Sequence, residues 1–245
     1  MMKRGIAILS ITALLLPQIV CGGSVAAAAD NSVIRALKSV VIPNFIIHDN
    51  LQTFDEVMED FCEQVNENRK VTDRSINFVI LSKKYGSKTK TPKLKAFAAE
   101  NRSAYEILME LAKRKNLLFR VKGNIVYIVS PGVKMQLSFA RVCGDCRFTQ
   151  RKLDEIIFPE IILDEVDFES VIDILNSGNY VAPDGEGVRV EWEADRKQRN
   201  KELYVTLTLR AVTLRELLDS ICFVTGCSYD IRPDKVVFFS GKRKN

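Results

Sequence analysis

Hydrophobic residues recur with the spacing of a helix in two segments that lie 110 residues apart. The apolar positions follow the series i, i+3, i+4, i+7 and i+8, and they are Ala104, Ile107, Leu108, Leu111 and Ala112 in the first segment and Leu214, Leu217, Leu218, Ile221 and Cys222 in the second. This spacing predicts two helices, each with one buried face.

Both helices carry the same start signal. A hydroxyl residue is followed three positions later by glutamate, and the two pairs are Ser103 with Glu106 and Thr213 with Glu216. Such a capping box satisfies two backbone donors at the start of a helix and stabilises it by roughly 1 kcal/mol. Asn116 and Gly226 follow the two helices and are residue types suited to a C-cap.

Two alternating runs joined by a turn follow each helix. They cover residues 117–121 and 125–129 after the first helix, and residues 227–231 and 235–239 after the second. A period of two around a turn rich in Gly, Asn, Pro or Asp predicts a hairpin of strands. Because helix and hairpin return at a constant offset, we interpret the chain as a duplicated domain.

The residues ahead of these helices repeat as well. Val40–Ile47 and Ile156–Leu163 are apolar runs with a proline at matching positions, and each predicts an opening strand at a sheet edge. Thr53 and Asp167 then begin two further amphipathic helices. Each unit therefore reads β-α-β-β-α-β-β. The predicted fold class is α+β, with tandem duplicated domains in which two helices pack between small sheets.

The start of the chain has the features of a secretory leader. Lys3 and Arg4 precede an apolar run from Ile6 to Leu16, and alanines at 27–29 form a cleavage site. We therefore expect an exported protein, periplasmic or associated with the outer membrane, with no integral membrane segment after leader removal. An uncleaved anchor and lipid attachment at Cys21 remain alternatives.

These signals divide the chain into six parts. The predicted parts are a signal peptide at 1–29, a short polar start at 30–36, a first domain at 37–131, a connector with one expected strand at 132–152, a second domain at 153–241 and a basic tail at 242–245.

The order of elements, the Ser/Thr-x-x-Glu signal and the closing hairpin resemble the STN family, the secretin and TonB N-terminus short domain. The resemblance covers Leu37–Val129 and Leu153–Phe239. It implies two periplasmic modules that engage protein partners in secretion or uptake assemblies. No part of the sequence is expected to supply the membrane barrel of those assemblies, so the resemblance does not carry pore or transport activity to this chain.

Composition agrees with a folded, exported protein. Hydrophobic residues make up 47% and charged residues 27% of the chain, which is ordinary for globular proteins. The formal net charge is +5, and it becomes smaller when the expected leader is removed with Lys3 and Arg4. Such a balance gives no reason to expect a nucleic-acid partner.

Cys143 and Cys146 are the sharpest chemical candidate. This CxxC spacing fits a structural disulfide, two free thiols or a redox pair. A redox pair is expected at the start of a helix, and residues 147–153 show no helical period. His48 is the sole histidine, so we expect no zinc site and no cofactor. The chain also lacks a phosphate loop or a nucleophile motif, and we predict no enzymatic activity.

The favoured interpretation is a non-enzymatic protein-binding module, an adaptor or accessory part of a secretin-type or TonB-dependent assembly. An exposed strand edge could capture a partner strand by main-chain pairing. The predicted edge residues are Val40, Ile42, Phe45, Ile47, Ile156, Phe158, Ile161 and Leu163. Alternatives are an envelope thiol–disulfide oxidoreductase using Cys143 and Cys146, and a structural spacer without a stoichiometric partner.

Overall fold

A computed structural model describes residues 31–48, 51–69, 75–81, 95–115, 117–129, 139–177, 185–193 and 203–240. The expected leader, the C-cap at Asn116, residues 132–138 of the connector and the basic tail lie outside these residues. Within them, no helix combines the length and the apolar character needed to cross a membrane.

The first unit runs from residue 31 to residue 129. Its elements are α1 (Asn31–Ser39), β1 (Val41–Ile47), α2 (Phe54–Asn68), β2 (Asn77–Leu81), β3 (Phe97–Ser103), α3 (Ala104–Lys115), β4 (Leu118–Lys122) and β5 (Ile125–Val129). Strand β1 pairs with β3 in an antiparallel ribbon, and β2, β5 and β4 form a second sheet in that order.

The second unit runs from residue 139 to residue 240. Its elements are β6 (Ala140–Val142), α4 (Arg147–Glu155), β7 (Ile157–Asp167), α5 (Phe168–Asn176), β8 (Arg189–Glu193), β9 (Tyr204–Thr213), α6 (Leu214–Thr225), β10 (Cys227–Ile231) and β11 (Lys235–Ser240). Strands β7 and β9 form an antiparallel ribbon, and the second sheet has the order β6-β10-β11-β8.

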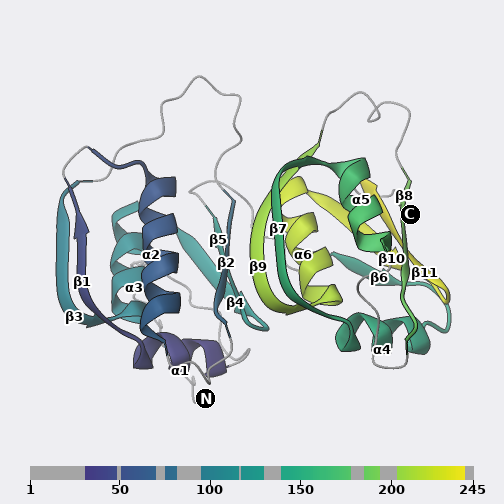
Figure 1. Cartoon of the computed structure of the whole chain (residues 1–245), viewed down its shortest axis with the longest axis horizontal. Helices are drawn as coiled ribbons and strands as arrows, with labels where there is room; N and C mark the ends of the chain where they lie inside the picture. Colours follow the sequence, from purple (N-terminus) through teal and green to yellow (C-terminus); the bar gives the residue numbers. More distant parts are fainter. Residues whose placement is uncertain are drawn as a thin grey trace, which may run out of the picture.

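The two units use the same pairings. The parallel pair of β2 with β5 corresponds to β8 with β11, and the antiparallel hairpin of β4 and β5 corresponds to β10 and β11. Figure 1 shows α2 and α3 of the first unit, and α5 and α6 of the second, between the ribbon and the larger sheet, with α1 and α4 at the lower end of the units. The predicted α+β class and the packing of two helices between small sheets are confirmed.

The helix faces also follow the prediction. The five apolar positions of α3 are buried, as are those of α6. Both capping boxes form, since the Ser103 hydroxyl accepts from the Glu106 amide and Thr213 does the same for Glu216. Gly226 ends α6 in the left-handed conformation, at φ 74°.

Two predictions for the residues that precede the opening strands were wrong. Helix α1 occupies most of the stretch expected to be a short polar start, and α4 follows the CxxC where no helix was expected. Both helices have nine residues and end directly before an opening strand. The inward face of α4 is made of Thr149, Lys152 and Leu153, so its helical period is hidden by two polar side chains.

Each ribbon has an interruption at the same place. Pairing skips Pro43 and Asn101 in the first ribbon, and Pro159 and Ala211 in the second. Asn101 and Ala211 both have φ of 50° and lie opposite the prolines. Proline lacks the backbone N–H that a regular ladder needs, so this conformation interrupts both ribbons where a donor is missing.

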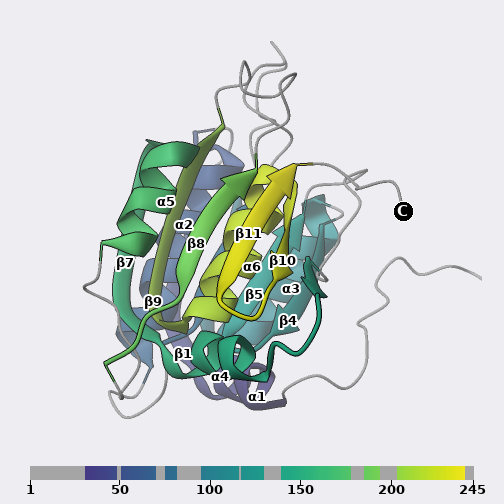
Figure 2. The same ribbon diagram turned by 90° about the vertical axis from the view of Figure 1, so that its right-hand side faces the viewer.

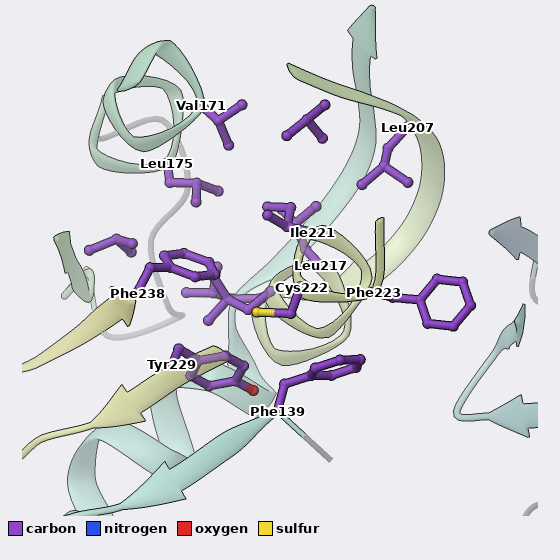
Figure 3. Packing of buried hydrophobic residues seen from close by; sticks show 14 of the residues in the cluster. Phe139, Val171, Leu175, Leu207, Leu217, Ile221, Cys222, Phe223, Tyr229 and Phe238 are labelled. Carbon is purple, nitrogen blue, oxygen red and sulfur yellow. The ribbon is translucent and has the colours of Figure 1, made fainter. Parts of the chain in front are cut away.

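The two hydrophobic cores meet along β5. All five residues of this strand are buried, because Val126 and Ile128 face the first unit's helices while Ile125, Tyr127 and Val129 join the core of the second unit. Figure 3 shows that core around Cys222 and Phe238, with Phe223 pointing away from its centre. The Phe223 ring lies 4.9 Å from the Tyr127 ring of the first unit. The units are therefore packed against each other through their cores.

Candidate functional site

The strand β7 has one edge that no other described strand covers. It is eleven residues long and pairs with β9 alone among the described strands. Figure 2 shows β7 at the margin of the molecule, beyond β9. The other edge of β9 lies toward β2, where the Asn77 side chain exchanges hydrogen bonds of 2.9 and 2.8 Å with the Arg210 backbone. The available edge of this ribbon is therefore that of β7.

The eight predicted edge residues are core residues. Their side chains are buried in the two units, and they are Val40, Ile42, Phe45, Ile47, Ile156, Phe158, Ile161 and Leu163. The outward positions of the same strands alternate with them, and among these Val41, Ile46, Ile157 and Ile162 are exposed. A strand that is apolar on one face turns that face to the core, so the residues a partner would touch are the intervening ones.

The outward face of β7 exposes two large apolar side chains. Ile162 is 63% exposed and Ile157 is 58% exposed. Between them, Glu160 forms an exposed 2.6 Å ion pair with Arg210 on β9. The pairing with β9 stays in register from residue 160 to residue 163, between Pro159 and a register shift at which Glu165 has φ of 49°. This stretch is the part of the edge best suited to strand pairing.

The CxxC lies at the start of α4. Cys146 is the N-cap residue and is buried, whereas Cys143 is partly exposed. Both thiols are free in this structure, so the disulfide is not formed here. The Cys146 sulfur donates to the Cys143 carbonyl at 2.7 Å and to the Ile231 carbonyl at 3.1 Å. Within the described residues, no three His, Cys, Asp or Glu side chains are grouped to hold a metal ion.

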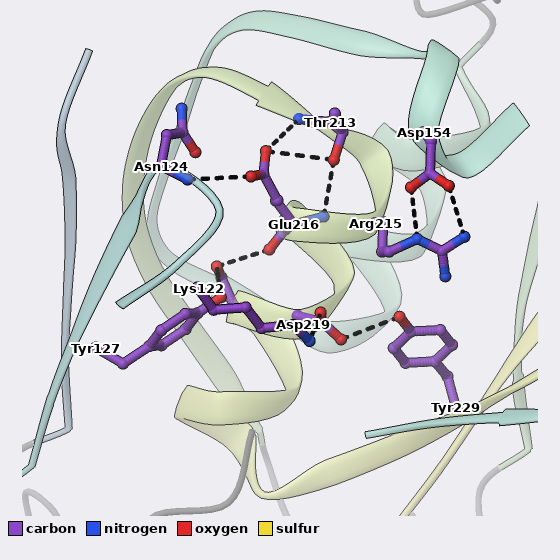
Figure 4. Close-up of polar contacts among 10 residues, drawn as sticks. Lys122, Asn124, Tyr127, Asp154, Thr213, Arg215, Glu216, Asp219 and Tyr229 are labelled. Atoms are coloured by element: carbon purple, nitrogen blue, oxygen red, sulfur yellow. Dashed lines mark hydrogen bonds and ion pairs between the residues drawn. The ribbon is translucent and has the colours of Figure 1, made fainter. Parts of the chain in front are cut away.

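A polar cluster between the two units was not predicted from the sequence. Asp219 of α6 is 2% exposed and accepts from Lys122 of β4 at 2.6 Å and from the Tyr229 hydroxyl at 3.0 Å. The Tyr127 hydroxyl lies 3.2 Å from Ser220, whose own hydroxyl donates to the Glu216 carbonyl. Figure 4 shows Lys122 and Asp219 together at α6, with Tyr127 and Tyr229 on either side of them. Buried polar groups need such partners, and here the partners come from both units.

The turn after β4 contacts the start of α6 through hydrogen bonds. The Asn124 amide donates to the Glu216 carboxylate at 3.3 Å, while the Asn124 side chain donates to the Ala211 carbonyl at 3.1 Å. Glu216 also accepts from the Thr213 amide at 2.9 Å. One carboxylate thus caps the helix and holds the neighbouring unit. Glu106, its counterpart in the first unit, has the capping role, and its pKa is lowered mainly by the Ser103 amide.

One sequence signal points to this interface. Phe223 stands 110 positions after Lys113, which is an exposed residue of α3, so the outer face of α6 carries an aromatic ring where the first unit has a charge. The second signal is the run of five apolar residues from Ile125 to Val129, which lacks the alternation of a half-buried strand. Together they indicate a sheet and a helix covered on both sides.

The two buried phenols make stability fall at alkaline pH. Burial raises the pKa of Tyr127 and of Tyr229, and the nearby Asp219 charge raises the pKa of Tyr229 further. Both hydroxyls stay neutral in the folded chain but ionise near about pH 10 when it unfolds. Tyr127 and Tyr229 therefore leave the free energy of unfolding unchanged below about pH 10, and above it each lowers this free energy by about 1.4 kcal/mol per pH unit.

Urea unfolding between about pH 8 and pH 11 measures this slope. Tyr127→Phe and Tyr229→Phe should each make the slope above about pH 10 shallower by about 1.4 kcal/mol per pH unit, while the buried Cys222 thiol, whose pKa burial also raises, keeps its own contribution. The exposed Tyr204 supplies the control, because Tyr204→Phe should leave the slope unchanged. An equal slope in all three variants would show that neither buried phenol causes it.

No protein-family model matches the chain, and comparisons with curated proteins and with solved structures found no match.

Proposed function

We propose that this protein is an exported, non-enzymatic protein-binding module that pairs a strand of its partner with the outer edge of β7. The observation that carries the proposal is this eleven-residue strand, which has a strand neighbour on one side only within the described structure and presents Ile157 and Ile162 outward. An edge strand offers a row of backbone donors and acceptors to an incoming strand. Main-chain bonds supply affinity in this mode, and side-chain positions on the outer face supply selectivity.

The chemistry of the partner segment follows from the outer face. Its side chains beside Ile162 would be apolar, because cross-strand neighbours contact each other directly. Residues flanking that position would be polar, since Glu160 and Asp164 lie on either side of Ile162 and are exposed. An extended segment with one apolar residue between polar ones therefore fits best.

Strand β1 is the weaker of the two candidate edges. It has seven residues, against eleven in β7, and both strands have a proline at their third position. Beyond the proline, β1 pairs over four residues, from Asn44 to Ile47, whereas β7 pairs from Glu160 to Leu163 and again at Val166 and Asp167. A shorter edge offers fewer main-chain bonds to a partner.

The resemblance to the STN family supports an envelope partner. Modules of that family engage proteins of secretin and TonB-dependent assemblies, and the leader sequence would bring this chain into the same compartment. We propose that the protein acts there as an adaptor, with its two units held as one body by the contacts around α6.

The test replaces outward residues of the two ribbons by lysine. Ile162→Lys should reduce capture of the partner by about tenfold, which corresponds to about 1.4 kcal/mol, because a charged side chain on an edge opposes strand addition. Ile46→Lys on β1 is the matched control, since Ile46 is also exposed. Capture is measured by crosslinking in envelopes of the native organism and co-purification, with unfolding curves to show that both variants fold.

Each outcome of this comparison decides between functions. Equal capture by wild type and Ile162→Lys would exclude the β7 edge, and a loss confined to Ile46→Lys would move the site to β1. Wild type that captures nothing would favour a spacer. Lysine at Ile161 or Leu163 gives no test, because both side chains are buried and the variants would unfold.

A further inference from the structure

The loop that contains the CxxC is hydrogen-bonded to the end of β10. The Cys143 amide and the Cys146 sulfur both donate to the Ile231 carbonyl, at 2.9 and 3.1 Å. Further along α4, the Thr149 hydroxyl donates to the Pro233 carbonyl at 2.7 Å. One carbonyl, that of Ile231, thus accepts hydrogen bonds from both cysteines of the CxxC. The Thr149 contact holds the following turn of α4 against the same part of the second unit.

The two thiols differ in access. Cys146 is 2% exposed, while Cys143 is partly exposed and the intervening Gly144 and Asp145 are exposed. Gly144 has φ of 78°, and no described atom lies within 4 Å of the position a Cβ would take there. The loop therefore projects to solvent at its tip, and a reagent can reach Cys143 before it can reach Cys146.

A cation is held by an ion pair two residues before the accessible cysteine. Arg141 donates to the Asp230 carboxylate at 3.1 and 3.2 Å, and its pKa is raised first by Asp230 and then by its contact with Cys143. By contrast, Cys222 is fully buried, and burial raises the pKa of its thiol, which keeps it neutral. Positive charge and partial exposure are the surroundings of reactive cysteines, and full burial is that of inert ones.

We propose that Cys143 and Cys146 form a reversible dithiol–disulfide pair that exchanges with disulfides, with Cys143 as the entry thiol and Cys146 as the resolving thiol. This site is separate from the β7 edge and does not depend on partner capture. Its co-reactant is a disulfide, either of a small thiol such as glutathione or of a protein.

The exchange takes two steps. The Cys143 thiolate attacks one sulfur of the incoming disulfide, whose S–S bond breaks, and the other sulfur leaves as a thiolate that takes up a proton. Cys146 then loses its proton and attacks the Cys143 sulfur, so the mixed disulfide breaks and the second thiolate leaves. The incoming disulfide has gained two electrons and two protons, and the protein's dithiol has become a disulfide.

The test treats the full mature protein with oxidised glutathione and maps the products by mass spectrometry. Wild type should lose two hydrogens and carry one bond between Cys143 and Cys146. Cys146→Ser should accumulate glutathione at Cys143, whereas Cys143→Ser should react at least about tenfold more slowly, because the remaining thiol is buried. Cys222→Ala is the matched control and should react like wild type, since alanine stands at the equivalent position, Ala112, in the first unit.

Three results would overturn the proposal. Glutathione trapped faster at Cys146 than at Cys143 would reverse the two roles. Wild type that stays oxidised in a large excess of reduced glutathione would have a structural disulfide. Alkylation of unmodified wild type by iodoacetamide at Cys146 before Cys143 would contradict the access difference without any substitution. Reduction of insulin by the reduced protein would support proteins as the disulfide source, and reaction with glutathione alone would support small thiols.

Discussion

Replacing Asp219 by alanine is expected to lower the free energy of unfolding by about 3 kcal/mol. The carboxylate is buried and is shared by the Lys122 ammonium and the Tyr229 hydroxyl. Lys122 is 42% exposed and can be hydrated when its partner is removed, whereas Tyr229 is fully buried and cannot. Most of the loss should therefore come from the hydroxyl left without an acceptor and from the gap left in the packing around α6.

Two signals of unfolding make this measurement specific. Trp192 is the sole tryptophan and lies in β8 of the second unit, so its fluorescence reports that unit, while circular dichroism reports the whole chain. Since Asp219 joins the two units, both signals should move to lower urea together. Asp219→Asn keeps an acceptor for Tyr229 and should cost less. A double-mutant cycle of Lys122→Met with Asp219→Asn isolates the ion pair, and additive losses would show that the pair contributes no coupling.

Gly123→Ala is expected to destabilise the chain by about 2–3 kcal/mol. Gly123 has φ of 61°, which costs a residue with a side chain about 1–2 kcal/mol. A Cβ at this position would also overlap the Glu216 carboxylate, which must then leave its place over the turn. That movement disturbs the capping box of α6 and its hydrogen bond from the Asn124 amide, which adds about 1 kcal/mol.

Gly226→Ala is the matched control for this prediction. Gly226 has φ of 74° at the other end of the same helix, and no described atom lies within 4 Å of its Cβ position. The Gly226→Ala variant should therefore lose only the free energy of unfolding that comes from the positive φ, about 1–2 kcal/mol. Equal losses in the two variants would mean that the contact between Gly123 and Glu216 does not hold the units together.

The capping boxes show which features follow from the sequence alone. Thr53 begins α2 as expected, and the predicted boxes at Ser103 and Thr213 both form. All the groups involved lie within four residues of one another, so their geometry depends on the local backbone. The same holds for the buried stripes of α3 and α6, which follow from helical spacing.

The edge of β7 shows where this reasoning stops. Alternation separates Ile161 and Leu163 from Ile162, but it places Ile157 with the first set, and it does not tell which set faces water when both are apolar. Ile157 faces outward because the strand is interrupted at Pro159. The helices α5 and α6, packed behind the ribbon, decide which set is buried. Helix α4 was missed for a related reason, because Thr149 and Lys152 are buried against neighbours that the local sequence does not reveal.

The sequence by itself determined the order of elements in each unit, the starts of the main helices and the core face of each one. Only the tertiary structure decided that α6 is covered on its other face too. Asp219 lies on the side that helical periodicity assigns to solvent, and it is buried because the sheet of the first unit, about a hundred residues earlier in the chain, packs over it. Helical periodicity predicts which face of a helix packs on the core of its own unit. Whether a second face is buried depends on how the two units pack against each other.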